Sequence, residues 1–180
     1  MKALQCVELA GPEKLIFTEV DDPKLGSGQV LIEIKAASVN FPDVLMIQGL
    51  YQNQPPMPFI PGAECSGVIA EIGEGVNSCN IGDHVFVMAG TGCFAEKLVI
   101  DATSVSLIPK TMDFPIAAAL PMTYGTSLYA LKQRANLQPE ETLLVLGAAG
   151  GVGLSAVELG KAMGAKVIAA ASSDEKIKIC

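Results

Sequence analysis

The chain has 180 residues, of which 50% are hydrophobic and 17% are charged. That composition excludes intrinsic disorder, because disordered chains combine low hydrophobicity with a high density of charge. The net charge of −7 argues against a nucleic-acid partner, since contacts to phosphates need clustered Lys and Arg. The longest apolar stretch, 142–157, contains four glycines and falls short of the roughly 20 residues of a membrane-spanning helix, so we expect no membrane partner either.

The first residues lack an apolar run long enough for a secretory signal peptide, because Glu8 and Pro12 interrupt it. We therefore expect a cytoplasmic protein. The cysteines are odd in number, scattered, and never spaced as CxxC, so neither a disulfide framework nor a structural zinc site is indicated. In a reducing compartment they are expected to be small buried apolar side chains. They are Cys6, Cys65, Cys79, Cys93 and Cys180.

Short β-type runs, separated by Gly and Pro, dominate the first 120 or so residues. Alternating apolar and polar residues at 29–35 predict a half-buried strand. A helix is expected at 42–48, with Asn40 as a possible N-cap. Such closely spaced strands favour a small barrel or sandwich. The other strands are expected at 2–7, 15–20, 66–72, 84–87 and 95–99.

The pattern changes after this β-rich part. Two helices are expected at 114–122 and 124–134. The apolar run 142–146 predicts a strand buried on both faces. A helix at 154–163, a second buried strand at 165–171 and the start of a further helix, capped within 172–174, complete the pattern. We expect an α/β chain with two domains: a β-rich domain at 1–122 and the first part of a nucleotide-binding domain at 123–180.

A glycine-rich loop lies between the strand at 142–146 and the helix that follows it. In a βαβ unit of about 30 residues, this pattern indicates a dinucleotide-binding turn. The first glycine permits the tight turn, the middle pair lets the backbone approach a pyrophosphate, and the last allows helix and strand to pack closely. Unpaired N–H groups at the helix N-terminus favour phosphate there. The alternative is a tight turn without a ligand. The residues expected to bind the cofactor here are Gly147, Ala148, Ala149, Gly150, Gly151, Val152 and Gly153.

The end of the second strand bears on which dinucleotide is bound. An NAD site usually has Asp or Glu there, about 20 residues after the glycines, but this chain has Ala171 and Ser172. Ser172 and Ser173 can donate hydrogen bonds to a 2′-phosphate, and Lys176 can add positive charge. NADPH is therefore favoured over NADH. Asp174 weakens that argument unless it only caps the next helix, and Lys176 could instead lie on a solvated helix face.

Several short motifs recur in the order found in a known family. Together they resemble the medium-chain dehydrogenase/reductase superfamily, and within it the zinc-free, zeta-crystallin-like quinone oxidoreductases. The resemblance covers the whole chain. It implies a GroES-like barrel, a Rossmann cofactor domain and NADPH-dependent hydride transfer to a small quinone or enone, in an enzyme that is expected to form a homodimer. Besides the glycine loop, the motifs are Val39–Asp43, Gly49–Tyr51, Pro58–Glu64, Gly82–Asp83 and Gly92–Glu96.

Zinc-containing relatives in this superfamily have a Cys where this chain has Asn40 and a His where it has Ala63. Glu64 remains, but one carboxylate does not make a zinc site, which needs three or four N, S or O ligands. The sole histidine, His84, lies in a turn where an exposed side chain is expected. We expect no metal.

The resemblance also implies residues beside the substrate and the cofactor. Asn40 and Tyr51 line the cleft in the resembling family, and the residue matching Ser127 lies near the nicotinamide ribose. Asn40 can donate to a developing oxyanion, and Tyr51 offers a phenol or an aromatic face. The alternatives are a helix cap for Asn40 and loop packing for Tyr51.

Length sets the competing hypothesis. Family members have a cofactor domain of about six strands, but here only its first βαβ unit is expected. The chain therefore reads as truncated within the Rossmann domain, and the alternative function is a catalytically incompetent binding or interaction protein. Weak or absent turnover is expected from the 180 residues alone.

Overall fold

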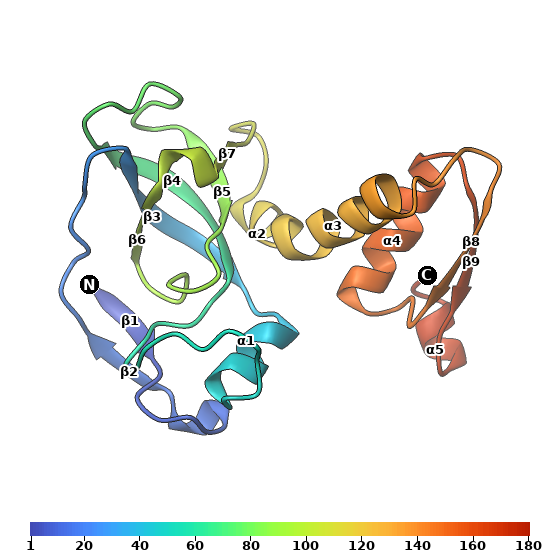
Figure 1. The fold of residues 1–180 in the computed structure, drawn as a ribbon, viewed down its shortest axis with the longest axis horizontal. Coiled ribbons are helices and arrows are strands. Elements are labelled where there is room, and N and C mark those ends of the chain that lie inside the picture. The colour runs from blue at the N-terminus through green and yellow to red at the C-terminus, as the bar shows by residue number, and fades with distance from the viewer. The chain divides into compact units, whose positions relative to one another are not determined.

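The computed structural model describes residues 1–180, which divide into two compact units, 1–119 and 120–180 (Figure 1). The first unit is built on a five-stranded antiparallel sheet with the strand order β6-β3-β4-β5-β7. Its longest strand, β3, lies between β4 and β6 and pairs with both. The strands are β3 (Gln29–Ser38), β4 (Glu64–Ile72), β5 (His84–Met88), β6 (Lys97–Asp101) and β7 (Val105–Leu107).

The core of this unit is the inner face of the curved sheet. Alternate side chains of β3, β4 and β5 point inward, as the period of two in a strand requires, and the centre includes Ile32, Ile69 and Val85, all fully buried. Gly67 of β4 pairs with Ile34 of β3, and a Cβ at Gly67 would come within 2.1 Å of the Glu33 carbonyl oxygen. A glycine is therefore required for the two backbones to approach so closely.

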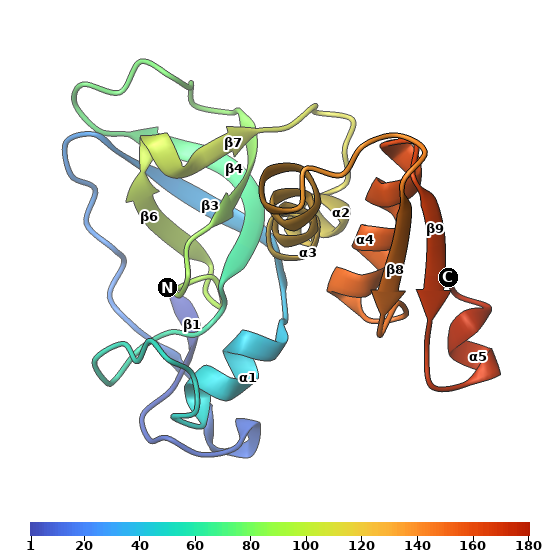
Figure 2. The same cartoon turned by 45° about the vertical axis from the view of Figure 1, so that its right-hand side comes forward.

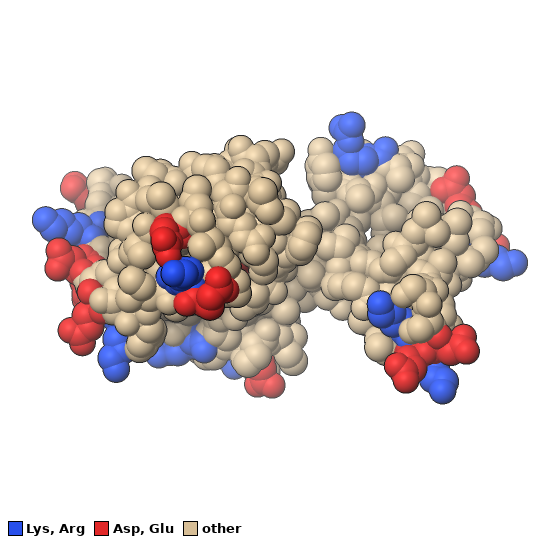
Figure 3. Space-filling view, turned by 90° about the horizontal axis from the view of Figure 1, so that it is seen from below, with Lys and Arg blue, Asp and Glu red and all other residues tan.

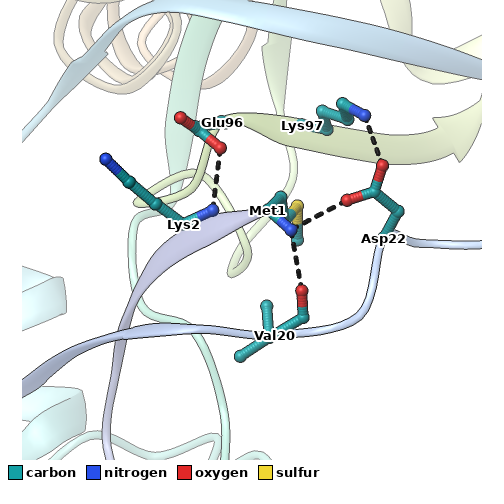
Figure 4. Close-up of polar contacts among 6 residues, drawn as sticks. All are labelled: Met1, Lys2, Val20, Asp22, Glu96 and Lys97. Carbon is teal, nitrogen blue, oxygen red and sulfur yellow. Dashed lines mark hydrogen bonds and ion pairs between the residues drawn. The ribbon is translucent and has the colours of Figure 1, made fainter.

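A second, two-stranded antiparallel sheet pairs β1 (Lys2–Gln5) with β2 (Ile16–Glu19). Asp22, just after β2, joins this sheet to β6: its carboxylate accepts from the Met1 amino group at 2.9 Å and forms an ion pair with Lys97 (Figure 4). Lys97 and the amino group together lower the pKa of Asp22 from 3.8 to about 2. The carboxylate therefore stays charged well into acidic solution.

Short helices complete the first unit. Helix α1 (Phe41–Ile47) begins beside β3, α2 (Phe114–Ala118) packs on β3 and β4, and single 3₁₀ turns lie at Pro12–Lys14 and Ala102–Ser104. At the start of α1, the Asp43 carboxylate accepts from the backbone N–H of Asn40 at 2.8 Å. This hydrogen bond to the N-cap residue, together with the proline at the second helical position, fixes where the helix begins.

The second unit is a pair of parallel strands connected by one helix and preceded in the chain by another (Figure 2). Helix α3 (Leu120–Leu128) continues into a π-helical turn, 129–134, and packs against α4. The predicted β-rich domain followed by the start of a nucleotide-binding fold is confirmed. The remaining elements are β8 (Thr142–Leu146), α4 (Gly151–Ala162), β9 (Lys166–Ala170) and α5 (Asp174–Ile177).

Three sequence-based expectations are wrong in detail. β8 and β9 are not buried on both faces: Val145 of β8 packs against α4, whereas Leu144 and Leu146 are 56% and 76% exposed and Ile168 of β9 is 48% exposed. Helix α4 covers only one face of the two-stranded sheet. An apolar run in a strand therefore does not show that both faces of the strand are buried. Cys180 is exposed, unlike the four other cysteines. His84 is half-buried, with its ring 4.7 Å from the Phe114 ring.

Charged side chains are sparse on one face of the molecule. Figure 3 shows acidic and basic groups close to each other in several places on both units, with uncharged residues covering most of the face in view. No helix of the chain is long and apolar enough to cross a membrane.

Candidate functional site

The glycine-rich loop is a tight turn that leads from β8 directly into α4. Gly147 has φ +70°, a left-handed conformation that disfavours other residues. A Cβ on Gly153 would lie 2.3 Å from the carbonyl oxygen of Gly147. Helix α4 begins at Gly151, three residues earlier than the sequence predicted, so the last glycines belong to its first turn. The two ends of the loop are thus pressed together, which only glycine permits.

A cavity of about 680 Å³ opens beside this turn. The loop borders it on one side, and the end of β9 with α5 borders it on the other. Of the predicted cofactor-binding residues, Gly147, Ala149, Gly150, Ser172 and Lys176 line it. Leu146, Ala170, Ala171 and Ile179 line it as well and were not predicted. Their apolar side chains could not be assigned from sequence, because residues at strand ends and in a final turn carry no periodic signal.

The polar rim of the cavity is formed by Ser172 and Lys176. The Lys176 ammonium group donates to the Ser172 hydroxyl at 3.3 Å, and both side chains are exposed. Ser173 is placed differently: its hydroxyl accepts from the backbone N–H of Lys176 and caps α5. Two of the three residues predicted to bind a 2′-phosphate therefore lie at the cavity, and the third orders the turn that presents them.

The other predicted loop residues lie behind the cavity. Ala148 is fully buried, and its N–H donates to the Ala170 carbonyl at 3.0 Å, which ties the loop to β9. Gly151 faces α3, where a Cβ would come within 3.0 Å of the Thr123 methyl group. Val152 is 46% exposed and, with Gly153, belongs to the first turn of α4.

Ser127 lies in α3 and is only 2% exposed. Its hydroxyl donates to the Val152 carbonyl at 2.8 Å and lies 2.9 Å from the Ser155 hydroxyl. The resemblance implied a place near the nicotinamide ribose for this residue. In the structure the Ser127 hydroxyl forms hydrogen bonds between helices α3 and α4. Its partner Ser155 was not predicted from the sequence.

In the first unit, Asn40 lies at the start of α1 with its amide group directed at a buried carboxylate. Its amide nitrogen donates to a Glu64 carboxyl oxygen at 2.7 Å and to the Ser38 hydroxyl at 2.9 Å. Ser38 also donates to Glu64, which is completely buried. The amide nitrogen of Asn40 is thus the atom that faces the Glu64 carboxyl group, and it already has two partners there. Donation to a substrate oxyanion would compete with these two contacts.

A second carboxyl group, that of Asp43, is buried beside this network and is 3% exposed. Burial raises the pKa of Asp43, and the charge of Glu64 adds to the rise, while hydrogen bonds from the backbone of Asn40 and Ala63 oppose it. One of its carboxyl oxygens, Oδ1, has no hydrogen-bond partner. The first unit therefore holds two neighbouring acids in a largely apolar interior.

Tyr51 follows α1 and is half-buried against an apolar cluster that includes Met46, Ile47 and Phe59. Its backbone carbonyl accepts from the Gln54 amide at 3.0 Å. This is the loop-packing role that sequence left open as an alternative. Asn40 and Tyr51 both belong to the first unit, whereas Ser127 and the glycine loop belong to the second.

Two buried thiols, Cys65 and Cys93, contact each other in the core of the first unit. That contact and burial raise the pKa of Cys93 far above its usual range. Thiolates, not thiols, are nucleophiles and metal ligands, so neither role suits Cys93. The structure holds no group of three or more His, Cys, Asp or Glu side chains placed to bind a metal ion.

The residues of the second unit fit a dinucleotide. The loop leaves no room for side chains where Gly147 and Gly153 meet, the helix that starts there is 12 residues long, and the cavity beside it has apolar walls and a basic rim. A loop of this kind brings backbone N–H groups to a pyrophosphate. The walls suit an adenine ring, and the rim suits a phosphate on the ribose.

The chain is similar to known proteins over nearly its whole length. Residues 26–110 match the family model described as the alcohol dehydrogenase GroES-like domain. Quinone oxidoreductase-like protein 2 of Rattus norvegicus is 40% identical over 179 residues, which cover 99% of this chain and 51% of the relative. The chain thus spans about half the length of the curated relatives it matches.

Solved structures show the same fold. A quinone oxidoreductase from Thermus thermophilus, solved also in complex with NADPH, is 34% identical and superposes with a TM-score of 0.86, over 98% of this chain and 55% of that one. The human synaptic vesicle membrane protein VAT-1 homolog-like protein is 33% identical, with a TM-score of 0.95 over 99% and 58% of the two chains.

Proposed function

Because the chain belongs to the quinone oxidoreductase-like family of the medium-chain dehydrogenase/reductase superfamily, we propose that it is part of an NADPH-dependent oxidoreductase. The substrates proposed are quinones or other α,β-unsaturated carbonyl compounds. The observation that carries the proposal is the cavity between the glycine loop and Lys176. It is supported by relatives of known structure that bind NADPH.

Each part of the second unit has a separate task in this proposal. The N–H groups at the start of α4 bind the pyrophosphate, and the dipole of the 12-residue helix favours its negative charge. Lys176 and Ser172 bind the 2′-phosphate, with Ser173 holding their turn in place through the α5 cap. Bound NADPH supplies the hydride, and the protein supplies position and polarity.

The first unit supplies the polar groups proposed for the substrate side. No metal is invoked there, because Glu64 already accepts hydrogen bonds from Ser38 and Asn40. Because the amide nitrogen of Asn40 already contacts Glu64 and Ser38, we expect a moderate rather than a large contribution from it to polarising a carbonyl oxygen. Tyr51 remains the candidate for a phenol donor or an aromatic contact to a flat substrate.

The proposal for turnover concerns the complete fold of the relatives, of which this chain spans about half. The exposed apolar face of β8 and β9, which includes Leu144, Leu146 and Ile168, is the place where further strands or helices would cover the sheet. We therefore propose that the 180 residues bind the cofactor but turn over quinones slowly or not at all.

The test is a pair of measurements on this chain. Titration with NADPH and with NADH, followed by calorimetry, is expected to show binding that is stronger for NADPH. Oxidation of NADPH in the presence of a simple quinone is expected to be close to the uncatalysed rate. Failure of the chain to bind either nucleotide would overturn the proposal for the cofactor, and rapid turnover would overturn the proposed division of labour.

A second candidate, that of a binding or interaction protein, is favoured by the same apolar face. A contiguous exposed apolar surface promotes association, and the open edges of the two-stranded sheet add unpaired backbone groups. On this proposal the chain forms a homodimer through β8 and β9. Sedimentation equilibrium of the unchanged chain and of Leu146→Lys tests it: the variant is expected to be monomeric, and a monomeric unchanged chain would contradict it.

A further inference from the structure

We infer that Ser127 and Ser155 are positioning residues that orient the phosphate-binding turn from helix α3. The inference rests on the proposed cofactor, because it assigns these hydroxyl groups a task in binding it. The affinity of the turn for pyrophosphate then depends on a segment outside the strand–helix–strand unit.

The contacts converge on one carbonyl group. The Val152 carbonyl oxygen accepts from the Ser127 hydroxyl at 2.8 Å. It also lies 2.9 Å from the Ser155 hydroxyl, whose single proton can be donated to only one acceptor at a time. Ser155 also lies within hydrogen-bond distance of the Thr123 carbonyl, at 3.0 Å, and of the Ser127 hydroxyl, at 2.9 Å. These bonds tie the first turn of α4 to the middle of α3.

The carbonyl of Val152 belongs to the same rigid peptide unit as the N–H of Gly153. A trans peptide is planar, so its C=O and N–H groups point in opposite directions. In a helix the C=O points toward the C-terminus and the N–H toward the N-terminus. Holding the Val152 oxygen therefore also fixes the direction of the Gly153 N–H, which points toward the N-terminal end of α4, where the proposed pyrophosphate would bind.

Burial makes these bonds effective. Ser127 and Ser155 are 2% and 1% exposed, so water does not compete for their hydroxyl groups, and loss of a partner leaves a buried polar atom unsatisfied. The chain also packs closely at the same point, because Gly151 lies against the Thr123 methyl group. Helix α3 thus supports the turn by shape and by hydrogen bonding together.

The structure offers a matched control on the same two helices. The Tyr124 hydroxyl of α3 donates to the Glu158 carboxylate of α4. This bond also joins the helices, but it lies on the exposed surface and away from the first turn. Tyr124→Phe removes a hydrogen bond between α3 and α4 without touching the Val152–Gly153 peptide.

The experiment compares Ser127→Ala, Ser127→Ala with Ser155→Ala, and Tyr124→Phe by calorimetric titration with two probes. NADPH reaches the glycine loop through its pyrophosphate, whereas adenosine 2′-monophosphate has none. One net hydrogen bond corresponds to a change of about five-fold in affinity. We expect about that loss of NADPH affinity for the single serine variant, about ten-fold or more for the double variant, and no loss for adenosine 2′-monophosphate or for Tyr124→Phe.

An amide spectrum of the ligand-free chain provides a readout that needs no cofactor. The Gly153 amide resonance is expected to shift in Ser127→Ala and to stay in place in Tyr124→Phe. Equal losses for both probes would show general loosening and overturn the inference, as would unchanged NADPH affinity in the double variant. An unchanged chain that binds adenosine 2′-monophosphate but not NADPH would overturn both the inference and the proposed cofactor.

Discussion

Only the first of the two units buries carboxyl groups. It encloses those of Asp43 and Glu64 besides the Ser66 hydroxyl, whereas the buried polar side chains of the second unit are the hydroxyls of Ser127 and Ser155. A buried carboxyl group is stabilised by hydrogen bonds within the protein, so these bonds are not available to a ligand. In the second unit charge is kept at the rim, on Lys176, where a ligand can use it. The first unit therefore satisfies its polar groups largely by itself, while the second unit keeps its charged group available for the proposed ligand.

The largest effect is expected where the glycine loop closes on itself. Gly153→Ala places a Cβ 2.3 Å from the Gly147 carbonyl oxygen, and because the obstacle is backbone, the turn must open. We expect a stability loss of about 2 kcal/mol or more and loss of detectable NADPH binding, measured by thermal unfolding and calorimetry. Gly125→Ala in α3 is the control, because nothing lies within 4 Å of its Cβ position, and it should stabilise the chain by up to about 1 kcal/mol. Normal binding by Gly153→Ala would contradict the close packing of the loop.

The next effect concerns the barrel alone. Glu64→Ala removes the acceptor shared by Ser38 and Asn40, so we expect a loss of about 1–3 kcal/mol in the free energy of unfolding. Glu33→Ala, which breaks an exposed ion pair with Lys35 on β3, should cost less than about 1 kcal/mol. Urea denaturation measures both. Equal free energies of unfolding for the two variants would show that the buried network stabilises the first unit no more than an exposed ion pair does.

The third effect concerns selectivity at the rim of the cavity. Lys176→Ala should lower the preference for NADPH over NADH by about ten-fold, the size expected when a charged hydrogen bond is lost. Lys178→Ala provides the matched control, because Lys178 is exposed near the same short helix but does not line the cavity. The affinities of both variants for both nucleotides are measured in parallel. An unchanged preference in Lys176→Ala would remove the charge-based argument for NADPH.

The smallest effects are two pH dependences of opposite sign. The pKa of Asp22 is lowered to about 2, so its contribution to stability is present above the unfolded pKa of 3.8 and is lost as the pH falls toward the folded one. The pKa of Asp43 is raised by burial, so its contribution is present below the unfolded pKa and is lost as the pH rises through the folded one. Urea midpoints across this range should show Asp22→Asn losing the first dependence and Asp43→Asn the second. High salt should weaken only the exposed Asp22 effect.

Local sequence patterns predicted the strand, turn and helix of the second unit well, because the residues that define them lie close together in the chain. The apolar run before Gly147 and the helical period after it define the strand, turn and helix of 142–162. Exposure of Leu144 and Leu146 could not be predicted, since it depends on which layers cover the sheet rather than on the strand itself.

The polar network of the barrel was beyond sequence reasoning for a different reason. Ser38 and Glu64 meet because β3 and β4 pair in a register that places them opposite each other, and a register shift of one residue would part them. Asn40 was found through a resemblance, but its engagement by two partners depends on that long-range pairing. Ser127 likewise required knowledge of which face α3 presents to α4.

Amide chemical-shift mapping during titration with NADPH tests the central claim most directly, because it reports where the nucleotide binds as well as whether it does. We predict perturbations at the glycine loop, 147–153, and at the end of β9 with α5, 170–179, together with an unperturbed Glu64 network. Shifts confined to the barrel, or none at saturating NADPH, would contradict the proposed cofactor site.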